Sequence, residues 1–125
     1  MDRSLPLKKI AVVTSGGDAP GMNAAVRAVV RSALVKGAQV LGFAHGYRGI
    51  IGNEVREMTS KSVGGIVSQG GTILHTARSP EFKKAEGRKQ AHDVLIENGA
   101  EGLIVIGGDG SLAGAKRLCD EFDFP

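Results

Sequence analysis

Residues 10–23 read IAVVTSGGDAPGMN, an unbroken apolar run followed by a loop rich in glycine. The run Ile10–Val13 is typical of a strand buried on both faces of a sheet. Pro20 stands where proline favours the opening of a helix, and apolar residues at helical spacing follow it until Gly37. A buried strand, a glycine-rich loop and a helix in this order predict the first unit of an α/β fold.

The remainder of the sequence continues this alternation of strands and helices. We expect residues 45–57 to be irregular, because Gly46, Gly49 and Gly52 mark turns, and Lys61–Ser68 to form a short helix. The other expected elements are strands at Gln39–Ala44 and Gly102–Ile106 and helices at Glu81–Asn98 and from Ser111 to about Glu121. The pattern predicts a three-layer α/β sandwich with a mostly parallel sheet.

Composition limits the classes of function. Nineteen of 125 residues are glycine, and they cluster in pairs between apolar runs, which indicates tight loops. The net charge of +3 and the small number of aromatic residues argue against a nucleic-acid surface and favour a local anion site. The single cysteine, Cys119, excludes an internal disulfide and a cysteine zinc cluster. Without a signal peptide or a membrane-length apolar run, we expect a cytoplasmic protein with no membrane partner.

The loop Ser15–Asn23 precedes a helix, where free N–H groups and the helix dipole favour an anion. Glycine there allows the backbone to approach a phosphate closely. The loop does not match the P-loop pattern, because Met22-Asn23 stand where Lys-Ser/Thr are required. A glycine-rich turn that binds no ligand is the alternative interpretation.

A second loop, Ile106–Ser111, also joins an apolar strand to a helix. Ligands of open α/β sheets bind outside the carboxyl ends of the strands. Asp109 offers a hard oxygen ligand for a magnesium ion that bridges to phosphate oxygens, or it caps the helix. Ser111 is suited to bind a phosphate, to cap the helix, or both. Gly114 either leaves room for a base or ribose or allows close helix–sheet packing.

A third loop, Gly70–Pro80, lies between the other two in the sequence. Arg78 could span two phosphates with its planar guanidinium, and the alternative is an exposed structural arginine. Of the three histidines, His75 is close to Arg78 and is a minor candidate for a ligand contact, whereas His45 and His92 are expected at the surface or in turns.

Together the three loops resemble ATP-dependent 6-phosphofructokinases of the bacterial type. The family's Ser-Gly-Gly-Asp-Ala-Pro-Gly-Met-Asn stretch is present as Ser15–Asn23, and its Gly-Gly-Thr and Ala-Arg elements as Gly70–Thr72 and Ala77-Arg78. With Ile106–Ser111, the resemblance extends from Lys9 to Pro125. A Gly-Gly-Asp-Gly loop alone also occurs in NAD kinases and lipid kinases, so the specific feature is the order of all three loops.

The resemblance implies a phosphofructokinase-like, Rossmann-like topology and a role for individual residues. Gly17 would meet the transferring phosphate, Arg78 would stabilise its charge, and Asp109 would bind Mg²⁺. Members that use pyrophosphate typically carry Asp where this chain has Gly110, so ATP is the expected donor. The residues implied in ATP binding are Gly17, Tyr47, Arg78, Ser79, Gly108, Asp109, Gly110, Ser111 and Gly114, of which Ser79 replaces a Phe often found in the family.

Arg27 and Arg31 lie four residues apart on one face of the first expected helix, which by itself fits a solvated helix face. The resemblance implies instead that they bind an allosteric effector between subunits, either a nucleotide diphosphate or phosphoenolpyruvate. Ser60 and Lys61 stand at effector positions where well-known members have an arginine and an aromatic residue, which changes the expected effector affinity. The family's usual oligomer is a homotetramer.

The resemblance also implies what the whole protein does. The expected reaction is transfer of the γ-phosphate of ATP to fructose 6-phosphate in glycolysis, with the general base and the sugar-binding residues beyond Pro125. Residues 1–125 are then the N-terminal nucleotide-binding part of a larger kinase domain, truncated before its next strand and inactive alone. A non-catalytic phosphate-sensing module and a kinase of the NAD or lipid group are the alternatives.

Overall fold

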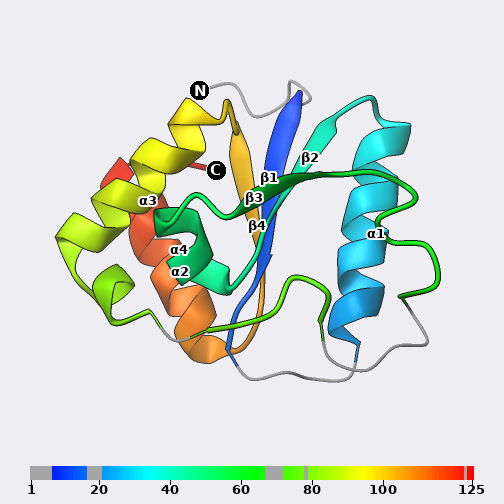
Figure 1. Ribbon diagram of the computed structural model, residues 1–125. Helices are drawn as coiled ribbons and strands as arrows, with labels where there is room; N and C mark the ends of the chain where they lie inside the picture. The colour runs from blue at the N-terminus through cyan, green and yellow to red at the C-terminus, as the bar shows by residue number, and fades with distance from the viewer. Residues whose placement is uncertain (1–6, 17–20, 67–71, 78, 123) are drawn as a thin grey trace.

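A four-stranded sheet lies between helices in the computed structural model (Figure 1), which describes residues 7–16, 21–66, 72–77, 79–122 and 124–125. Its strand order is β3-β2-β1-β4, with β1 parallel to β2 and β4 and with β3 antiparallel to β2. The elements are β1 (Lys9–Thr14), α1 (Met22–Val35), β2 (Gln39–Phe43), α2 (Gly46–Ile51), β3 (Val55–Met58), the 3-10 helix η2 (Pro80–Lys83), α3 (Ala85–Glu97), β4 (Gly102–Ile106) and α4 (Asp109–Phe122). The expected α/β fold with a mostly parallel sheet is confirmed.

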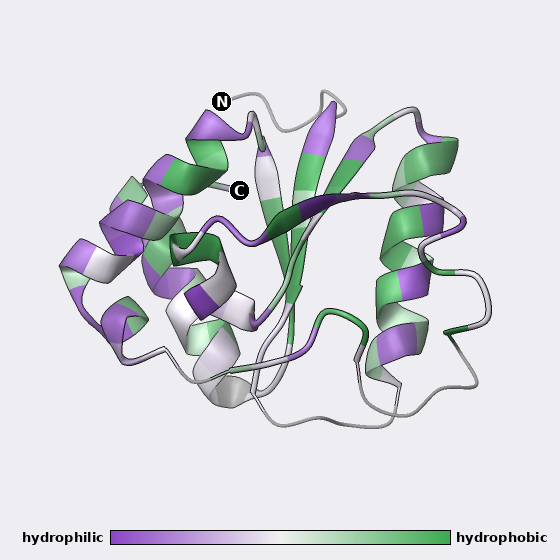
Figure 2. Cartoon of the chain, viewed as in Figure 1, coloured by the Kyte–Doolittle hydropathy of each residue, from purple (hydrophilic) through white to green (hydrophobic). Residues whose placement is uncertain are grey.

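The central strand β1 contributes side chains to both faces of the sheet. Ile10 and Val12 join an apolar cluster with α1, while Ala11 and Val13 join a second cluster with α2, α3 and α4. Figure 1 shows the same division, with α1 over one face and the other helices over the opposite face. In Figure 2 the strands behind β3 are hydrophobic along their middle, whereas the helices mix hydrophilic and hydrophobic residues. Burial on both faces therefore explains the unbroken apolar run of β1.

Residues 45–57 are not irregular as expected, because they contain helix α2 and strand β3. A Cβ on Gly49 would lie 1.4 Å from the carbonyl oxygen of Ala44, so this glycine permits a close backbone approach inside a short helix. Tyr47 and Ile50, three positions apart, are the buried side chains that hold α2 against the core. Gly49, which suggested a turn, is thus needed for packing.

Two expected helices also differ from the structure. In Lys61–Ser68 the described part forms turns at 61–65 and a 3-10 residue at 66. Residues 81–98 are divided into η2 and α3, because Lys84 has an extended backbone with φ −98° and ψ 146°. A Cβ on Gly87 would lie 1.8 Å from the Glu81 carbonyl oxygen, so η2 folds back onto the first turn of α3.

The remaining element boundaries agree with expectation to within two residues. Helix α1 begins at Met22 behind Gly21, whose φ is 92°, and Pro20 lies outside the described residues. Strand β2 ends at Phe43, and α4 begins two residues before Ser111. Among the described residues, no helix is both long and apolar enough to cross a membrane.

We predict that Gly49→Ala destabilises the fold far more than Gly52→Ala. The added methyl at position 49 meets the backbone of Ala44, whereas at position 52 the nearest atom lies 3.4 Å away and φ is −83°. Overpacking typically costs about 1–3 kcal/mol, and the Gly52 variant should remain within about 0.5 kcal/mol of the wild type. Thermal unfolding midpoints of both variants measure the difference, and equal midpoints would contradict the role of Gly49.

Candidate functional site

The Ser15–Asn23 and Ile106–Ser111 loops meet at the carboxyl ends of β1 and β4. The Ser15 N–H donates to the Ile106 carbonyl oxygen at 2.9 Å. A Cβ on Gly107 would lie 2.5 Å from the Ser15 carbonyl oxygen, so only glycine allows this approach. Because β2 and β4 lie on opposite sides of β1, the loops leave the sheet where its winding reverses. This is the place where open α/β sheets bind ligands.

The second loop presents backbone groups in open space. The first hydrogen bond of α4 joins the Leu112 N–H to the Gly108 carbonyl oxygen at 3.0 Å, so the N–H groups before Leu112 precede the helical ladder. A Cβ on Gly108 or on Gly110 would have no atom within 4 Å. Asp109 is the first residue of α4, and its side chain lies outside what the structure describes. A helix N-terminus with exposed glycines on both sides of Asp109 is suited to an anion.

An aromatic pair stands beside the first turns of α4. The rings of Tyr47 and Phe82 stack with centroids 3.8 Å apart and planes 2° apart. The Tyr47 hydroxyl donates to the carbonyl oxygen of Ser111 at 2.5 Å, and a Cβ on Gly114 would lie 3.1 Å from Phe82 and 3.4 Å from Tyr47. Gly114 therefore faces aromatic rings. We call Tyr47 and Phe82 the aromatic wall.

Burial raises the pKa of the Tyr47 hydroxyl above its ordinary value, and the hydroxyl remains a protonated donor at neutral pH. Tyr47 as a whole is 6% exposed. Two interactions therefore hold Tyr47 in place: its ring stacks on Phe82, and its hydroxyl donates to Ser111 of α4.

The segment 72–77 is attached to the same edge of the sheet. Thr14, the last residue of β1, donates from its hydroxyl to the His75 carbonyl oxygen at 3.0 Å and contacts the Thr72 hydroxyl at 2.9 Å. The Asn23 side-chain oxygen accepts from the Ile73 N–H at 2.8 Å. The third loop is thus connected to β1 and to the start of α1, beside the other two loops.

The structure brings together Tyr47, Ser111 and Gly114, and it places Gly108, Asp109 and Gly110 at the adjacent helix start. Ser79 lies immediately before η2, with a buried Oγ that has no hydrogen-bond partner among the described residues. Gly17 and Arg78 lie outside the described residues.

The residues expected to bind an effector lie on other elements. Arg27 and Arg31 are on α1, with Arg31 exposed and with the buried Nε of Arg27 lacking a partner among the described residues. Ser60 and Lys61 are exposed in the turn after β3. Apolar residues of that turn and of α1 share one cluster, on the face of the sheet opposite the aromatic wall. The two expected groups of binding residues are therefore separated by the sheet.

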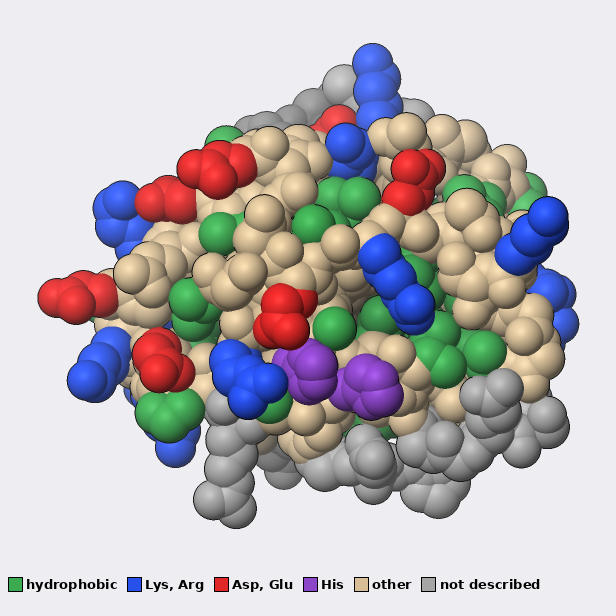
Figure 3. All heavy atoms as spheres, viewed as in Figure 1, with side chains coloured by type: hydrophobic (Ala, Val, Ile, Leu, Met, Phe, Trp, Pro, Cys, Tyr) green, Lys and Arg blue, Asp and Glu red, His purple; other side chains and the backbone are tan. Residues whose placement is uncertain are grey.

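His45 and His75 form a further pair near this edge. Their rings stack with centroids 5.4 Å apart, and His45 Nδ1 lies 3.2 Å from a carboxylate oxygen of Glu54. Figure 3 shows two neighbouring histidine side chains on its visible face, next to side chains of both charges. Within the described residues no group of three His, Cys, Asp or Glu side chains could hold a metal ion.

Phe82 is the functional candidate that sequence reasoning missed. It is 4% exposed and makes up half of the aromatic wall. Its spacing in the sequence resembles that of any buried helix residue, and its partner lies 35 residues earlier. The only available signal was its rarity, as one of four Phe in the chain.

Comparisons with known proteins agree on one family. The family model described as Phosphofructokinase matches residues 9–125. The ATP-dependent 6-phosphofructokinase of Clostridium tetani is 60% identical over 114 residues, covering 91% of this chain and 36% of the relative. That of Halalkalibacterium halodurans is 56% identical, covering 95% of this chain and 37% of the relative. The chain thus spans little more than a third of the length of these curated relatives.

Solved structures show the same likeness. A crystal structure of Pichia pastoris phosphofructokinase in the T-state matches with a TM-score of 0.89 and 48% identity, covering 92% of this chain and 12% of that one. A pyrophosphate-dependent phosphofructokinase from Nitrosospira multiformis matches with a TM-score of 0.80 over 91% of this chain and 30% of that one. Because that match is only 14% identical, it shows the shared fold alone.

We predict that Tyr47→Phe removes a pH-dependent part of the stability. Unfolded tyrosine ionises at its ordinary pKa of 10.0, whereas the folded hydroxyl has a raised pKa. The contribution of the hydroxyl is therefore complete below about pH 10 and is lost as pH rises towards the folded value. Thermal unfolding of wild type and variant between about pH 8 and pH 11 tests this. The stability difference should shrink above about pH 10, and a constant difference would refute the assignment.

Proposed function

The chain belongs to the phosphofructokinase family, and we propose that the protein carrying it transfers the γ-phosphoryl group of ATP to fructose 6-phosphate. The observation that supports this best is the contact between the two glycine loops beside the aromatic wall. Residues 1–125 would supply the N-terminal nucleotide-binding part of the kinase domain. Phosphoryl transfer depends mainly on positioning and on neutralisation of charge, and backbone amides at a helix start provide both.

Each loop has a separate part in this proposal. Gly17 and Arg78 contact the transferring phosphoryl group, Arg78 by its planar array of donors. Gly108, Gly110 and Ser111 hold the phosphates of ATP at the start of α4. The open space at Gly108 and Gly110 supports this assignment, because a phosphate needs room at the backbone.

Tyr47 and Gly114 then lie on the nucleoside side of the site, with Ser79 next to Arg78 at the start of η2. The buried Ser79 hydroxyl that lacks a partner among the described residues is consistent with a ligand contact there.

Magnesium fits this site as a partner of the nucleotide. Mg²⁺ is usually held by one or two carboxylates together with substrate phosphates and water. Asp109, at the start of α4 between two glycines in open space, is the residue that would hold it. The ion would neutralise charge on the phosphates.

Regulation and assembly complete the proposal. Arg27 and Arg31, with Ser60 and Lys61, would form an effector site for a nucleotide diphosphate or phosphoenolpyruvate at a subunit boundary of a homotetramer. Their position on the opposite face of the sheet from the aromatic wall fits an effector site separate from the nucleotide site. We also propose a cytoplasmic location for the protein.

We predict that Gly110→Asp selectively impairs use of ATP. The new carboxylate enters space free of protein atoms, so the unfolding midpoint should hardly change. Two like charges about 4 Å apart repel by about 4 kcal/mol at an effective dielectric constant of about 20, so kcat/KM for MgATP should fall by roughly 100-fold or more.

Gly110→Ala is the control that adds volume without charge, and its loss should be much smaller. Kinetics of both variants with MgATP and fructose 6-phosphate provide the measurement. If Gly110→Asp retained full activity with ATP, the phosphates could not lie at Gly110.

We also predict that residues 1–125 alone have no measurable phosphofructokinase activity, since the expected general base and sugar-binding residues lie outside them. General base catalysis alone contributes roughly 10²–10⁴-fold. A coupled assay of the purified chain should stay at background, with the longer protein as positive control. Ordinary turnover by residues 1–125 would refute the proposed division of the site.

A further inference from the structure

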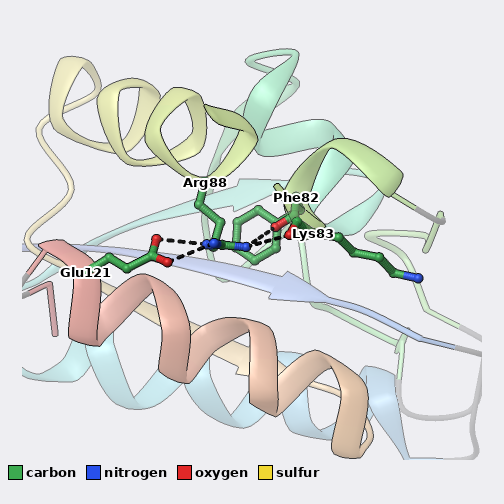
Figure 4. A network of polar contacts seen from close by, with 4 residues as sticks. All are labelled: Phe82, Lys83, Arg88 and Glu121. Carbon is green, nitrogen blue, oxygen red and sulfur yellow. Dashed lines mark hydrogen bonds and ion pairs between the residues drawn. The ribbon is translucent and has the colours of Figure 1, made fainter. Parts of the chain in front are cut away.

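A buried arginine connects the C-terminal end of α4 to η2. Arg88, in the first turn of α3, has a side chain that is 7% exposed. Its Nε and Nη2 donate to the two carboxylate oxygens of Glu121, both at 2.8 Å (Figure 4). This bidentate geometry holds the carboxylate in one orientation relative to α3.

The remaining guanidinium nitrogen is also used. Nη1 donates to the carbonyl oxygens of Phe82 and Lys83, at 3.1 and 2.9 Å. These carbonyls lie in the last turn of η2, and Figure 4 shows the guanidinium between them and the Glu121 carboxylate. Arg88 therefore fixes the backbone of Phe82 relative to α4.

These contacts follow one another in a series that starts at one end of α4 and returns to its other end. Glu121 holds Arg88, Arg88 holds the Phe82 backbone, and the Phe82 ring stacks on Tyr47. Tyr47 then donates to the carbonyl oxygen of Ser111, in the first turn of α4. Glu121 lies ten residues after Ser111, or about 15 Å along the helix axis.

We propose that Glu121 is a positioning residue for the nucleotide site. Through Arg88 it sets where the aromatic wall stands against the first turns of α4. This inference rests on the proposed function, because the wall borders the helix start assigned to the phosphates. Glu121 itself lies too far along α4 to touch a ligand bound at Ser111.

The Glu121 carboxylate is charged at neutral pH. Hydrogen bonds from Arg88 hold the pKa of the Glu121 carboxyl below its ordinary value of 4.5. Arg117 adds a smaller attraction in the same direction. We call the bidentate pair of Arg88 and Glu121 the clamp. The clamp is therefore intact at neutral pH and is lost only as pH falls through the lowered pKa of Glu121.

The test compares two carboxyl-to-amide variants on one helix. Glu121→Gln removes the charge and one acceptor of the clamp while keeping its shape. Asp120→Asn is the matched control, because Asp120 is 66% exposed and lies 3.9 Å from Lys116 in a surface pair. In the full protein, Glu121→Gln should raise KM for MgATP roughly 5–20-fold, with kcat and the fructose 6-phosphate response within about twofold. Asp120→Asn should match the wild type.

A double variant tests whether Glu121→Gln changes KM for MgATP by way of the aromatic wall. In a Phe82→Leu background, Glu121→Gln should add less than about twofold to KM, because the ring that Arg88 positions is already absent. If Glu121→Gln raised KM in the Phe82→Leu background by the same factor as in the wild type, the proposal would be overturned. An unchanged KM for MgATP in Glu121→Gln alone would also overturn it. So would a loss of kcat and of the response to fructose 6-phosphate as large as the change in KM for MgATP.

Wild-type measurements separate this inference from the proposed function. If the wild type binds MgATP by calorimetry but does not phosphorylate fructose 6-phosphate, the proposed reaction is wrong. The MgATP dissociation constant of the same variants then replaces KM, with the same expected ratios. If the wild type does not bind MgATP, both the proposed function and the role of Glu121 are wrong.

Discussion

The parallel pairing of β1 with β4 is the interaction on which the arrangement of the site depends. It brings Thr14 opposite Ile106, so that two chain segments more than 80 residues apart end at the same edge. The hydrogen bond from Ser15 to Ile106 continues this pairing into the loops, and Gly107 allows the backbones to touch. A mostly parallel sheet buried by helices on both faces thus supplies a rigid base for loops whose own backbones are exposed.

Sequence could predict the elements whose signals are local. The apolar runs of β1 and β4 and the glycine loops after them were recognisable, because strand burial and backbone approach leave direct traces in composition. Helix α2 was missed because the reason for Gly49 is the carbonyl of Ala44, a contact that exists only in the folded chain. The break at Lys84 was missed for a similar reason, since η2 approaches Gly87 closely and its carbonyls accept hydrogen bonds from Arg88, which Glu121 orients.

The residues of the candidate site likewise divide into those that the sequence could predict and those that it could not. Motif spacing identified residues of the two loops and, through the resemblance, Tyr47. It could not identify Phe82, because stacking on Tyr47 depends on how η2 lies over α2, which no periodicity encodes. Nor could it distinguish among glycines: Gly107 is closely packed, whereas Gly108 and Gly110 face open space. These positions look alike in sequence and differ in what a side chain there would displace.

The aromatic wall has an optical consequence. Within residues 1–125 Tyr47 is the single tyrosine and there is no tryptophan. Tyrosine fluorescence and tyrosine circular dichroism of this chain therefore arise from one ring, which is stacked on Phe82 and hydrogen-bonded to α4. A ligand that shifts α4 relative to η2 changes the surroundings of that ring. The chain thus carries its own spectroscopic reporter, without an added label, at the border of its candidate site.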